Sequence, residues 1–275
     1  MKIPTCKSAM QPPYRIIHQA EFERHPKSRK PVDRDRMLGS RVSEDWVTWN
    51  AFRLLELLTP DKWWPNLVTL AKAENPSLAL PVGWEQSPLV NLWDLIASPT
   101  SYEKASRERM RNSDNPAWKA RSDNPKPVEG SSEIDVTLRN CVLVVVAEAK
   151  LGSDISARTK YDPLRDQIVR NIDCALDQAG NQIPIFWMLV RDTGPSRLYT
   201  KLLHDYRINP DTLIGKLPHR DSARVVALAK NLSIIPWKDL LQSMIELSVC
   251  QDDDETKVIA KELALRIGVS CGKRC

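Results

Sequence analysis

The apolar and polar positions predict alternating helices and strands from Ser43 onward. After Ser43, apolar residues recur at helical spacing as far as Leu58, just before Pro60. Ser43 is a typical helix cap, and Glu44 places negative charge in the first turn, where the helix dipole favours it. A helix is therefore expected over 43–58.

The most regular part of the chain predicts a β-hairpin. Residues 134–138 alternate, and 141–150 form an apolar, strongly β-branched run. Between them, Arg139-Asn140 is a candidate for the turn. Asp162-Pro163 is typical of a helix start, with apolar residues following at 164, 168, 172, 175 and 179.

The remaining elements complete a mixed α/β plan with helices on a central sheet. We expect a strand over 183–190, a helix around 196–206, a strand ending near 235 and helices over 237–249 and after the acidic run 252–255. A short helix is expected over 89–97, and a loop or small helical insertion over 100–128.

These patterns divide the chain into segments of different character. Residues 1–42 are polar and proline-containing, and we interpret them as an N-terminal arm. Residues 43–250 form the expected domain, with 60–128 as a helical and loop insertion, and 251–275 form a C-terminal helical tail.

Composition narrows the class of protein. The chain has 275 residues, 42% of them hydrophobic and 27% charged, which excludes disorder, collagen and coiled coil as descriptions of the whole. The longest apolar run, 141–147, is too short to span a membrane, and the first residues lack a secretory apolar core. Six scattered cysteines without a CxxC pair favour a reducing cytoplasm.

The net charge of +5 is unevenly distributed. Residues 1–42 carry ten basic and four acidic residues, a net of +6, whereas the rest carries 30 basic and 31 acidic. A basic arm on a neutral body is compatible with a polyanionic partner, although charge alone favours a solvated arm. A solvated arm without a partner is the alternative.

The end of the hairpin carries the candidate chemistry. Glu148 and Lys150 share one strand face, and Asp135 lies on the preceding strand. Two carboxylates that converge at a sheet edge form a hard-oxygen site suited to Mg²⁺ or Mn²⁺. A nearby lysine can activate water or stabilise charge that develops on a phosphate.

Glu133-Ile134-Asp135, twelve intervening residues and Glu148-Ala149-Lys150 resemble the PD-(D/E)XK nuclease superfamily. Glu44 at the start of a preceding helix and Gln167 on a following helix match further features of that superfamily. The resemblance implies a restriction-endonuclease-like mixed central sheet flanked by helices. It also implies a Mg²⁺-dependent nuclease, either endo- or exonucleolytic.

The resemblance also implies roles for these residues. The cation would be held by the side chains of Asp135 and Glu148 and by the Ala149 carbonyl, whereas Glu44 would bind a second metal ion or hold a metal-bound water. Lys150 would position or activate water, and Gln167 would orient Lys150 or contact a phosphate.

One point of geometry leaves the ligand open. A two-residue turn at Arg139-Asn140 would pair Asp135 near Val144 rather than Glu148, unless the strand bends or bulges. Glu133 is therefore an alternative ligand.

Around the site, Arg158, Lys160, Arg165 and Arg170 could line a phosphate track, although a solvated helix face is the simpler interpretation of each. We expect DNA rather than RNA as substrate, and a homodimer or a partner protein if both strands of a duplex are cut. The main alternative is a non-catalytic nucleic-acid-binding or assembly protein that retains this fold. A helical interaction protein is a third interpretation, and it predicts that these side chains do not cluster.

Overall fold

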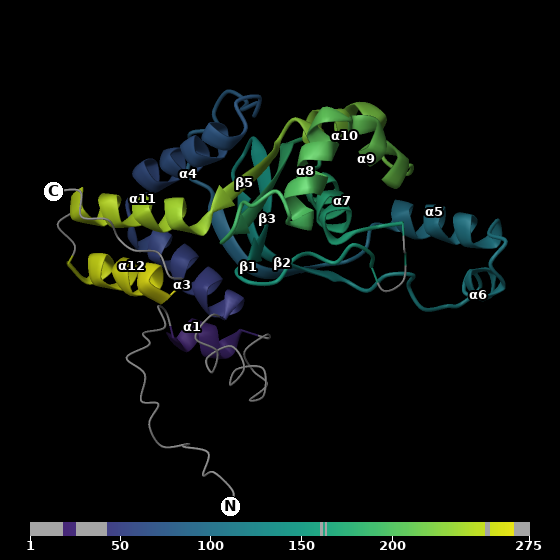
Figure 1. Cartoon of the computed structure of the whole chain (residues 1–275), viewed down its shortest axis with the longest axis horizontal. Coiled ribbons are helices and arrows are strands. Elements are labelled where there is room, and N and C mark those ends of the chain that lie inside the picture. The colour runs from purple at the N-terminus through teal and green to yellow at the C-terminus, as the bar shows by residue number, and fades with distance from the viewer. Residues whose placement is uncertain (1–18, 26–42, 160–161, 163, 251–253, 267–275) are drawn as a thin grey trace, which may run out of the picture.

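A mixed sheet lies at the centre of the computed structural model, which describes residues 19–25, 43–159, 162, 164–250 and 254–266. Within these residues the sheet has five strands in the order β1-β2-β3-β4-β5 (Figure 1). The strands are β1 Leu89–Ile96, β2 Ser132–Arg139, β3 Leu143–Lys150, β4 Ile183–Val190 and β5 Leu232–Pro236. β1, β2 and β3 pair antiparallel, and β3, β4 and β5 pair parallel.

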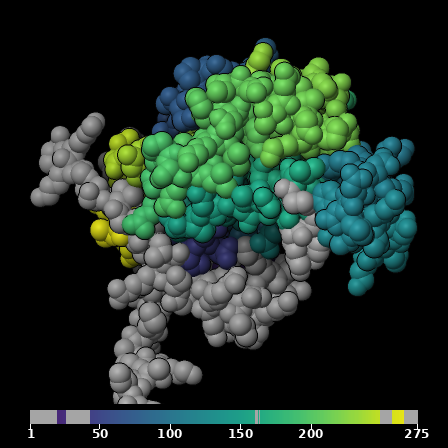
Figure 2. Space-filling view, turned by 45° about the vertical axis from the view of Figure 1, so that its right-hand side comes forward, coloured from purple at the N-terminus to yellow at the C-terminus, as the bar shows by residue number. Residues whose placement is uncertain are grey.

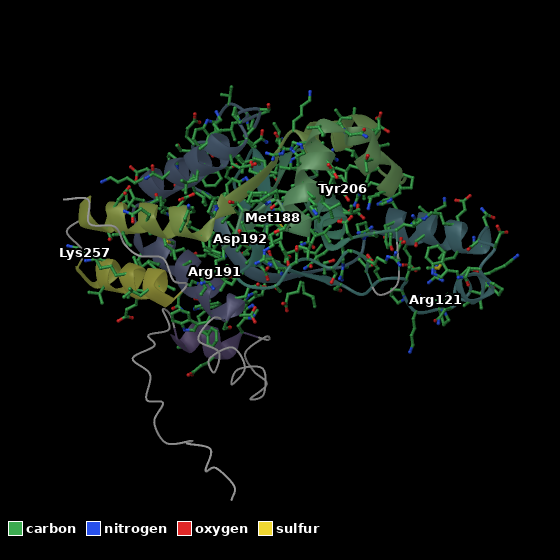
Figure 3. All side chains as sticks on the ribbon, in the orientation of Figure 1. Arg121, Met188, Arg191, Asp192, Tyr206 and Lys257 are labelled. Atoms are coloured by element: carbon green, nitrogen blue, oxygen red, sulfur yellow. The ribbon has the colours of Figure 1, made fainter. Side chains whose placement is uncertain are left out.

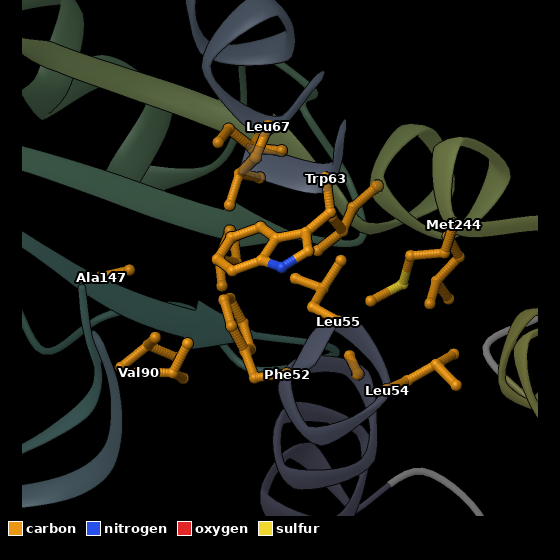
Figure 4. Packing of buried hydrophobic residues seen from close by; sticks show 14 of the residues in the cluster. Phe52, Leu54, Leu55, Trp63, Leu67, Val90, Ala147 and Met244 are labelled. Carbon is orange, nitrogen blue, oxygen red and sulfur yellow. The ribbon is translucent and has the colours of Figure 1, made fainter. Parts of the chain in front are cut away.

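Helices cover both faces of this sheet and form two separate cores (Figure 1). The first core lies against α1 Gln19–Arg24, α3 Glu44–Leu57, α4 Pro60–Glu74, α11 Trp237–Cys250 and α12 Asp254–Arg266. The second core lies against α7 Gln167–Ala179, α8 Leu198–Ile208, α9 Pro210–Lys216 and α10 Ser222–Ala229. In Figure 4, side chains from α3, α4 and α11 meet those of Val90 and Ala147 in the first core.

Several predicted elements are confirmed. The helix after Ser43 is α3, and the Ser43 hydroxyl accepts a hydrogen bond from the Trp46 amide at 3.3 Å. The hairpin strands are β2 and β3, and the buried strand over 183–190 is β4. Every residue of β3 is buried because helices cover both faces of the sheet.

The short helix predicted over 89–97 is wrong, because Leu89–Ile96 forms the edge strand β1. Buried Val90 and Leu92 alternate with exposed Leu89 and Asn91, as expected for a strand with one covered face. Pairing with β2 therefore decides the conformation. Residues 60–128 are not an insertion as a whole, since β1 belongs to the sheet and α4 packs on β5 and α11.

A smaller part of that segment does project from the body. α5 Thr100–Arg111 and α6 Pro116–Lys119 form a lobe that projects from the sheet in Figure 1 and lies at the right-hand edge of the molecule in Figure 2. Tyr102, Met110 and Val128 form its own small core.

The predicted arm and tail also contribute to the first core. Phe22 of α1 is fully buried, and α12 packs on α11 and α3. The rest of the predicted arm, 1–18 and 26–42, and residues 251–253 and 267–275 lie outside the described residues. In the part of the chain that is described, no helix combines the length and the apolarity needed to cross a membrane.

Helix α7 begins later than predicted. Its cap is Asp166, whose carboxylate accepts from the Val169 amide at 2.9 Å, and Gln167 is the first helical residue. Leu164 is 54% exposed, so it does not belong to the apolar stripe of the helix. This start places Gln167 in the first turn, where it can face the end of β3.

Candidate functional site

The hairpin register brings the two predicted strand carboxylates to the same end of the hairpin. The loop between the strands is longer than the predicted turn, because the Asn140 side-chain oxygen accepts from the amides of Val142 and Leu143, both at 3.0 Å. Pairing then runs from Arg139↔Val144 to Val136↔Ala147. Val144 pairs with Arg139, so the pairing of Asp135 near Val144 that a two-residue turn would give does not occur; Asp135 and Glu148 lie just beyond the last pair.

Glu148 is the buried centre of the site. One carboxylate oxygen, Oε1, accepts from Lys150 Nζ at 2.6 Å and from Gln167 Nε2 at 2.5 Å. The other oxygen, Oε2, accepts from Asn171 Nδ2 at 2.6 Å. Lys150 of the same strand and two side chains of α7 thus converge on one carboxylate that is only 3% exposed.

Lys150 lies among three of the predicted metal-ligating oxygens. Besides Glu148, its ammonium contacts the carbonyl oxygen of Ala149 at 2.9 Å and Glu44 Oε1 at 3.1 Å. The amine is largely buried, and charge-assisted contacts of this kind are the strong ones. The ammonium therefore takes up the position in which a cation would meet these oxygens.

Glu44 reaches the site from the start of α3. Its second oxygen, Oε2, accepts from the Leu151 amide at 3.0 Å, directly after β3 ends. The cap at Ser43 fixes where the helix begins and hence where this side chain projects. The predicted helix-start carboxylate is thus joined to the predicted strand-end lysine.

Asp135 occupies the place where β2 and β3 separate. Beyond Val136↔Ala147 the carboxylate oxygen Oδ2 of Asp135 accepts from the Ala149 amide at 2.8 Å. The side chain thus continues the contact between the strands after their pairing ends. Glu133, the alternative ligand, is exposed and lies opposite Leu95 of β1.

The site lies at the carboxyl end of the parallel strands. Met188 is the β4 neighbour of Glu148, and Arg191 and Asp192 follow the end of β4 (Figure 3). The Arg191 amide donates to the Lys150 carbonyl at 3.1 Å, and the Arg191 side chain is exposed. Sequence reasoning missed this arginine, a cation that starts beside the site.

Burial and charge act against each other on the two central groups. Burial raises the pKa of Glu148, and Glu44 adds to this, although Lys150 and Asn171 oppose it. Burial alone would lower the pKa of Lys150, but the carboxylates of Glu148, Glu44 and Asp135 outweigh it and raise the pKa. The cluster therefore favours a charged lysine and a carboxyl group that is harder to ionise than usual.

The donor set suits a hard divalent cation only after a rearrangement. Among the described residues, no group of three or more His, Cys, Asp or Glu side chains is placed to hold a metal ion as it stands. The carboxylates of Asp135, Glu148 and Glu44 and the Ala149 carbonyl have the chemistry that Mg²⁺ and Mn²⁺ prefer. Lys150 must leave these oxygens before they can surround a cation.

The predicted phosphate track is only partly realised. Arg158 is exposed, and Lys160 lies outside the described residues. Arg170 donates to the carbonyl oxygens of Gly130 and Ser131, so it braces the start of β2.

Arg165 does not belong to such a track, because its side chain is buried. It pairs with Asp173 at 2.8 Å and with Glu129 at 3.3 Å, and lies 3.9 Å from the centre of the Tyr102 ring. A buried guanidinium with these partners cannot reach a phosphate. Its function is to hold the loop before α7 against α5.

Asn171 is the main side chain that sequence reasoning missed. It lies four residues after Gln167 on α7, and both donate to Glu148. Residues at this spacing share one helix face, so the signal was in the sequence once Gln167 was singled out.

Comparison with models of known protein families, with curated protein sequences and with solved structures found no match to this chain. The described residues form an α/β fold with a mixed five-stranded sheet.

Proposed function

We propose that this protein is a metal-dependent nuclease of the PD-(D/E)XK type, with a restriction-endonuclease-like fold and DNA as the expected substrate. The observation that carries the proposal is convergence. Glu44, Gln167 and the hairpin residues Asp135, Glu148 and Lys150 come from four separate elements and are linked by direct contacts around the end of β3. A chance strand-end motif gives no reason for α3 and α7 to supply the matching side chains.

The proposed chemistry assigns each group a task. A bound Mg²⁺ or Mn²⁺, held by Asp135, Glu148 and the Ala149 carbonyl with Glu44 nearby, would polarise the phosphate and lower the pKa of a bound water. Lys150 Nζ, once released from the carboxylates, would donate to a phosphate oxygen and stabilise charge that develops there.

The neighbouring residues hold this arrangement in place. Gln167 and Asn171 orient the Glu148 carboxylate, since each fixes one of its oxygens. Exposed Arg191 and Arg158 would contact the phosphate backbone, which supplies most sequence-independent affinity for nucleic acid. The +6 charge of residues 1–42 would add to this attraction.

A second candidate function is a non-catalytic nucleic-acid-binding or assembly protein with the same fold. One observation favours it: the Glu148 oxygens and the Lys150 ammonium satisfy one another, as in a purely structural ion cluster. Such a cluster predicts binding to nucleic acid without hydrolysis.

Cleavage assays separate the two functions. Plasmid, linear duplex and single-stranded DNA, with an RNA of matched length, are incubated with the protein and Mg²⁺, Mn²⁺ or EDTA. The nuclease function predicts cation-dependent cleavage that both Glu148→Ala and Lys150→Ala abolish. Cleavage that persists in both variants, or no cleavage of any substrate, would contradict it.

A further inference from the structure

Trp93 has a backbone conformation that is rare for a residue with a side chain. Its φ is +57°, and among the described residues it is the only non-glycine residue with positive φ. Side chains other than glycine are crowded by the backbone in this left-handed region. Such residues persist only where the surroundings impose them, and they concentrate at functional sites.

The register places Trp93 directly opposite Asp135. Leu92 pairs with Val136 and Asp94 pairs with Ile134, so the intervening position on β1 faces the intervening position on β2. The strained residue is thus the cross-strand neighbour of a proposed metal ligand.

Both strands exchange faces at this pair. Leu92 and Val136 belong to the first core, whereas Ile134 and Ile96 belong to the second core. In a regular strand, residues two apart lie on the same face, so Ile134 would join Val136. Ile134 lies in the second core instead, and on β1 the adjacent residues Leu92 and Trp93 both lie in the first core. Both strands therefore twist out of the regular alternation at this pair.

This turn coincides with the end of pairing between β2 and β3. The last pair is Val136↔Ala147, and beyond it Asp135 bonds the Ala149 amide through its side chain. The change of face thus accompanies the placement of the Asp135 carboxylate beside β3.

An aromatic cluster packs around the turn. The Trp93 ring stacks on Trp49 of α3, with centroids 5.1 Å apart and planes 26° apart. Phe22 of α1 and His25 approach the same ring at 6.0 and 4.9 Å. Because α3 also carries Glu44, one cluster anchors both the turn and the helix that supplies this carboxylate.

We propose that Trp93 is a positioning residue, whose left-handed backbone, held by the stack on Trp49, places Asp135 against Ala149. The importance of this placement for hydrolysis rests on the proposed nuclease function. The placement itself is a property of the chain and can be tested without any cation.

The test compares Trp93→Gly with Trp93→Ala. Both variants remove the indole, but only glycine adopts a positive φ readily. We expect the Ala149 amide to remain protected from hydrogen exchange in Trp93→Gly and to exchange at least tenfold faster in Trp93→Ala, with exchange measured by NMR. Trp93→Gly should also unfold at a higher urea concentration than Trp93→Ala.

The matched control is the pair Leu95→Gly and Leu95→Ala, at an exposed position of the same strand. At this position the glycine variant should be less stable than the alanine variant, as is usual within a strand. Trp93→Phe, which retains an aromatic ring, should keep the Ala149 protection and serves as the test if neither smaller variant folds.

Equal protection in Trp93→Gly and Trp93→Ala, or loss of protection in a folded Trp93→Phe, would overturn the proposal. Neither result depends on cleavage. A wild-type protein that cuts no substrate would refute the nuclease function, while the exchange measurements would still decide the role of Trp93.

Discussion

Replacement of Lys150 by methionine should increase the affinity for a divalent cation, although it removes a residue proposed to be needed for hydrolysis. The ammonium contacts Glu148 Oε1 at 2.6 Å and Glu44 Oε1 at 3.1 Å, two of the oxygens a cation would use. In the wild type, a cation must first displace this amine. In Lys150→Met the oxygens are free of it, and methionine fills the buried volume.

The structure sets the expected size of the effect. A hydrogen bond to a charged group contributes about 1.5–3 kcal/mol net. Displacement from two carboxylates therefore costs roughly 3 kcal/mol at the lower end, and about 1.4 kcal/mol corresponds to a tenfold change in affinity. Loss of the lysine also makes Glu148 harder to ionise, which works in the opposite direction. We expect Mn²⁺ to bind about 10- to 100-fold more tightly.

Isothermal titration with Mn²⁺ at about pH 8 measures this directly, since a higher pH favours the ionised form of the Glu148 carboxyl. Lys104→Met, at an exposed lysine on α5, controls for the loss of one positive charge from the whole protein. Mn²⁺ affinity in Lys150→Met equal to or weaker than that of the wild type would refute the idea that the ammonium competes with the cation.

Three further results are expected. Asn171→Leu removes a donor that lowers the Glu148 pKa, so the midpoint of Mn²⁺ binding against pH should move to higher pH; an unchanged midpoint counts against this role. The Asp173 pKa is lowered from 3.8 to about 2, because bonds from His219 and nearby arginines outweigh burial. Its stabilisation is therefore present at neutral pH and lost as the pH falls from about 4 to about 2. Asp173→Asn should lower the free energy of unfolding at neutral pH by about 3 kcal/mol and flatten this acid limb in urea titrations. Phe22→Ala should cost about 3 kcal/mol in the same assay, since Phe22 is fully buried, and a cost below about 1 kcal/mol would show that α1 contributes little.

The sequence was most informative where local signals and burial agree. The cap at Ser43, the valine-rich β3 and the apolar β4 follow from patterns that need no tertiary partner to be recognised. The hairpin and Glu44 were predicted for the same reason. The contact between Glu44 and Lys150, which are 106 residues apart in the chain, was expected only from the family resemblance.

The errors arose where tertiary partners decide the outcome. Residues 89–96 show both helical and alternating character, and pairing with β2 selects the strand. The longer hairpin loop depends on the Asn140 side chain, which captures two backbone amides. Arginine is usually found at the surface, but Arg165 is buried because it pairs with Asp173 of α7 and with Glu129, which precedes β2. Neither partner is close to Arg165 in a way that the sequence pattern reveals. A left-handed Trp93 has no sequence signal, because this conformation usually belongs to glycine.

A crystal of the protein soaked in Mn²⁺ would test the central claim most directly, with anomalous scattering to locate the ion. The proposed site predicts a peak at coordination distance, about 2.1–2.2 Å, from the Asp135 and Glu148 carboxylates, with Lys150 moved away from them. No ion at this position at saturating Mn²⁺, with Lys150 still bound to Glu148 and Glu44, would contradict the claim that these residues form a metal site.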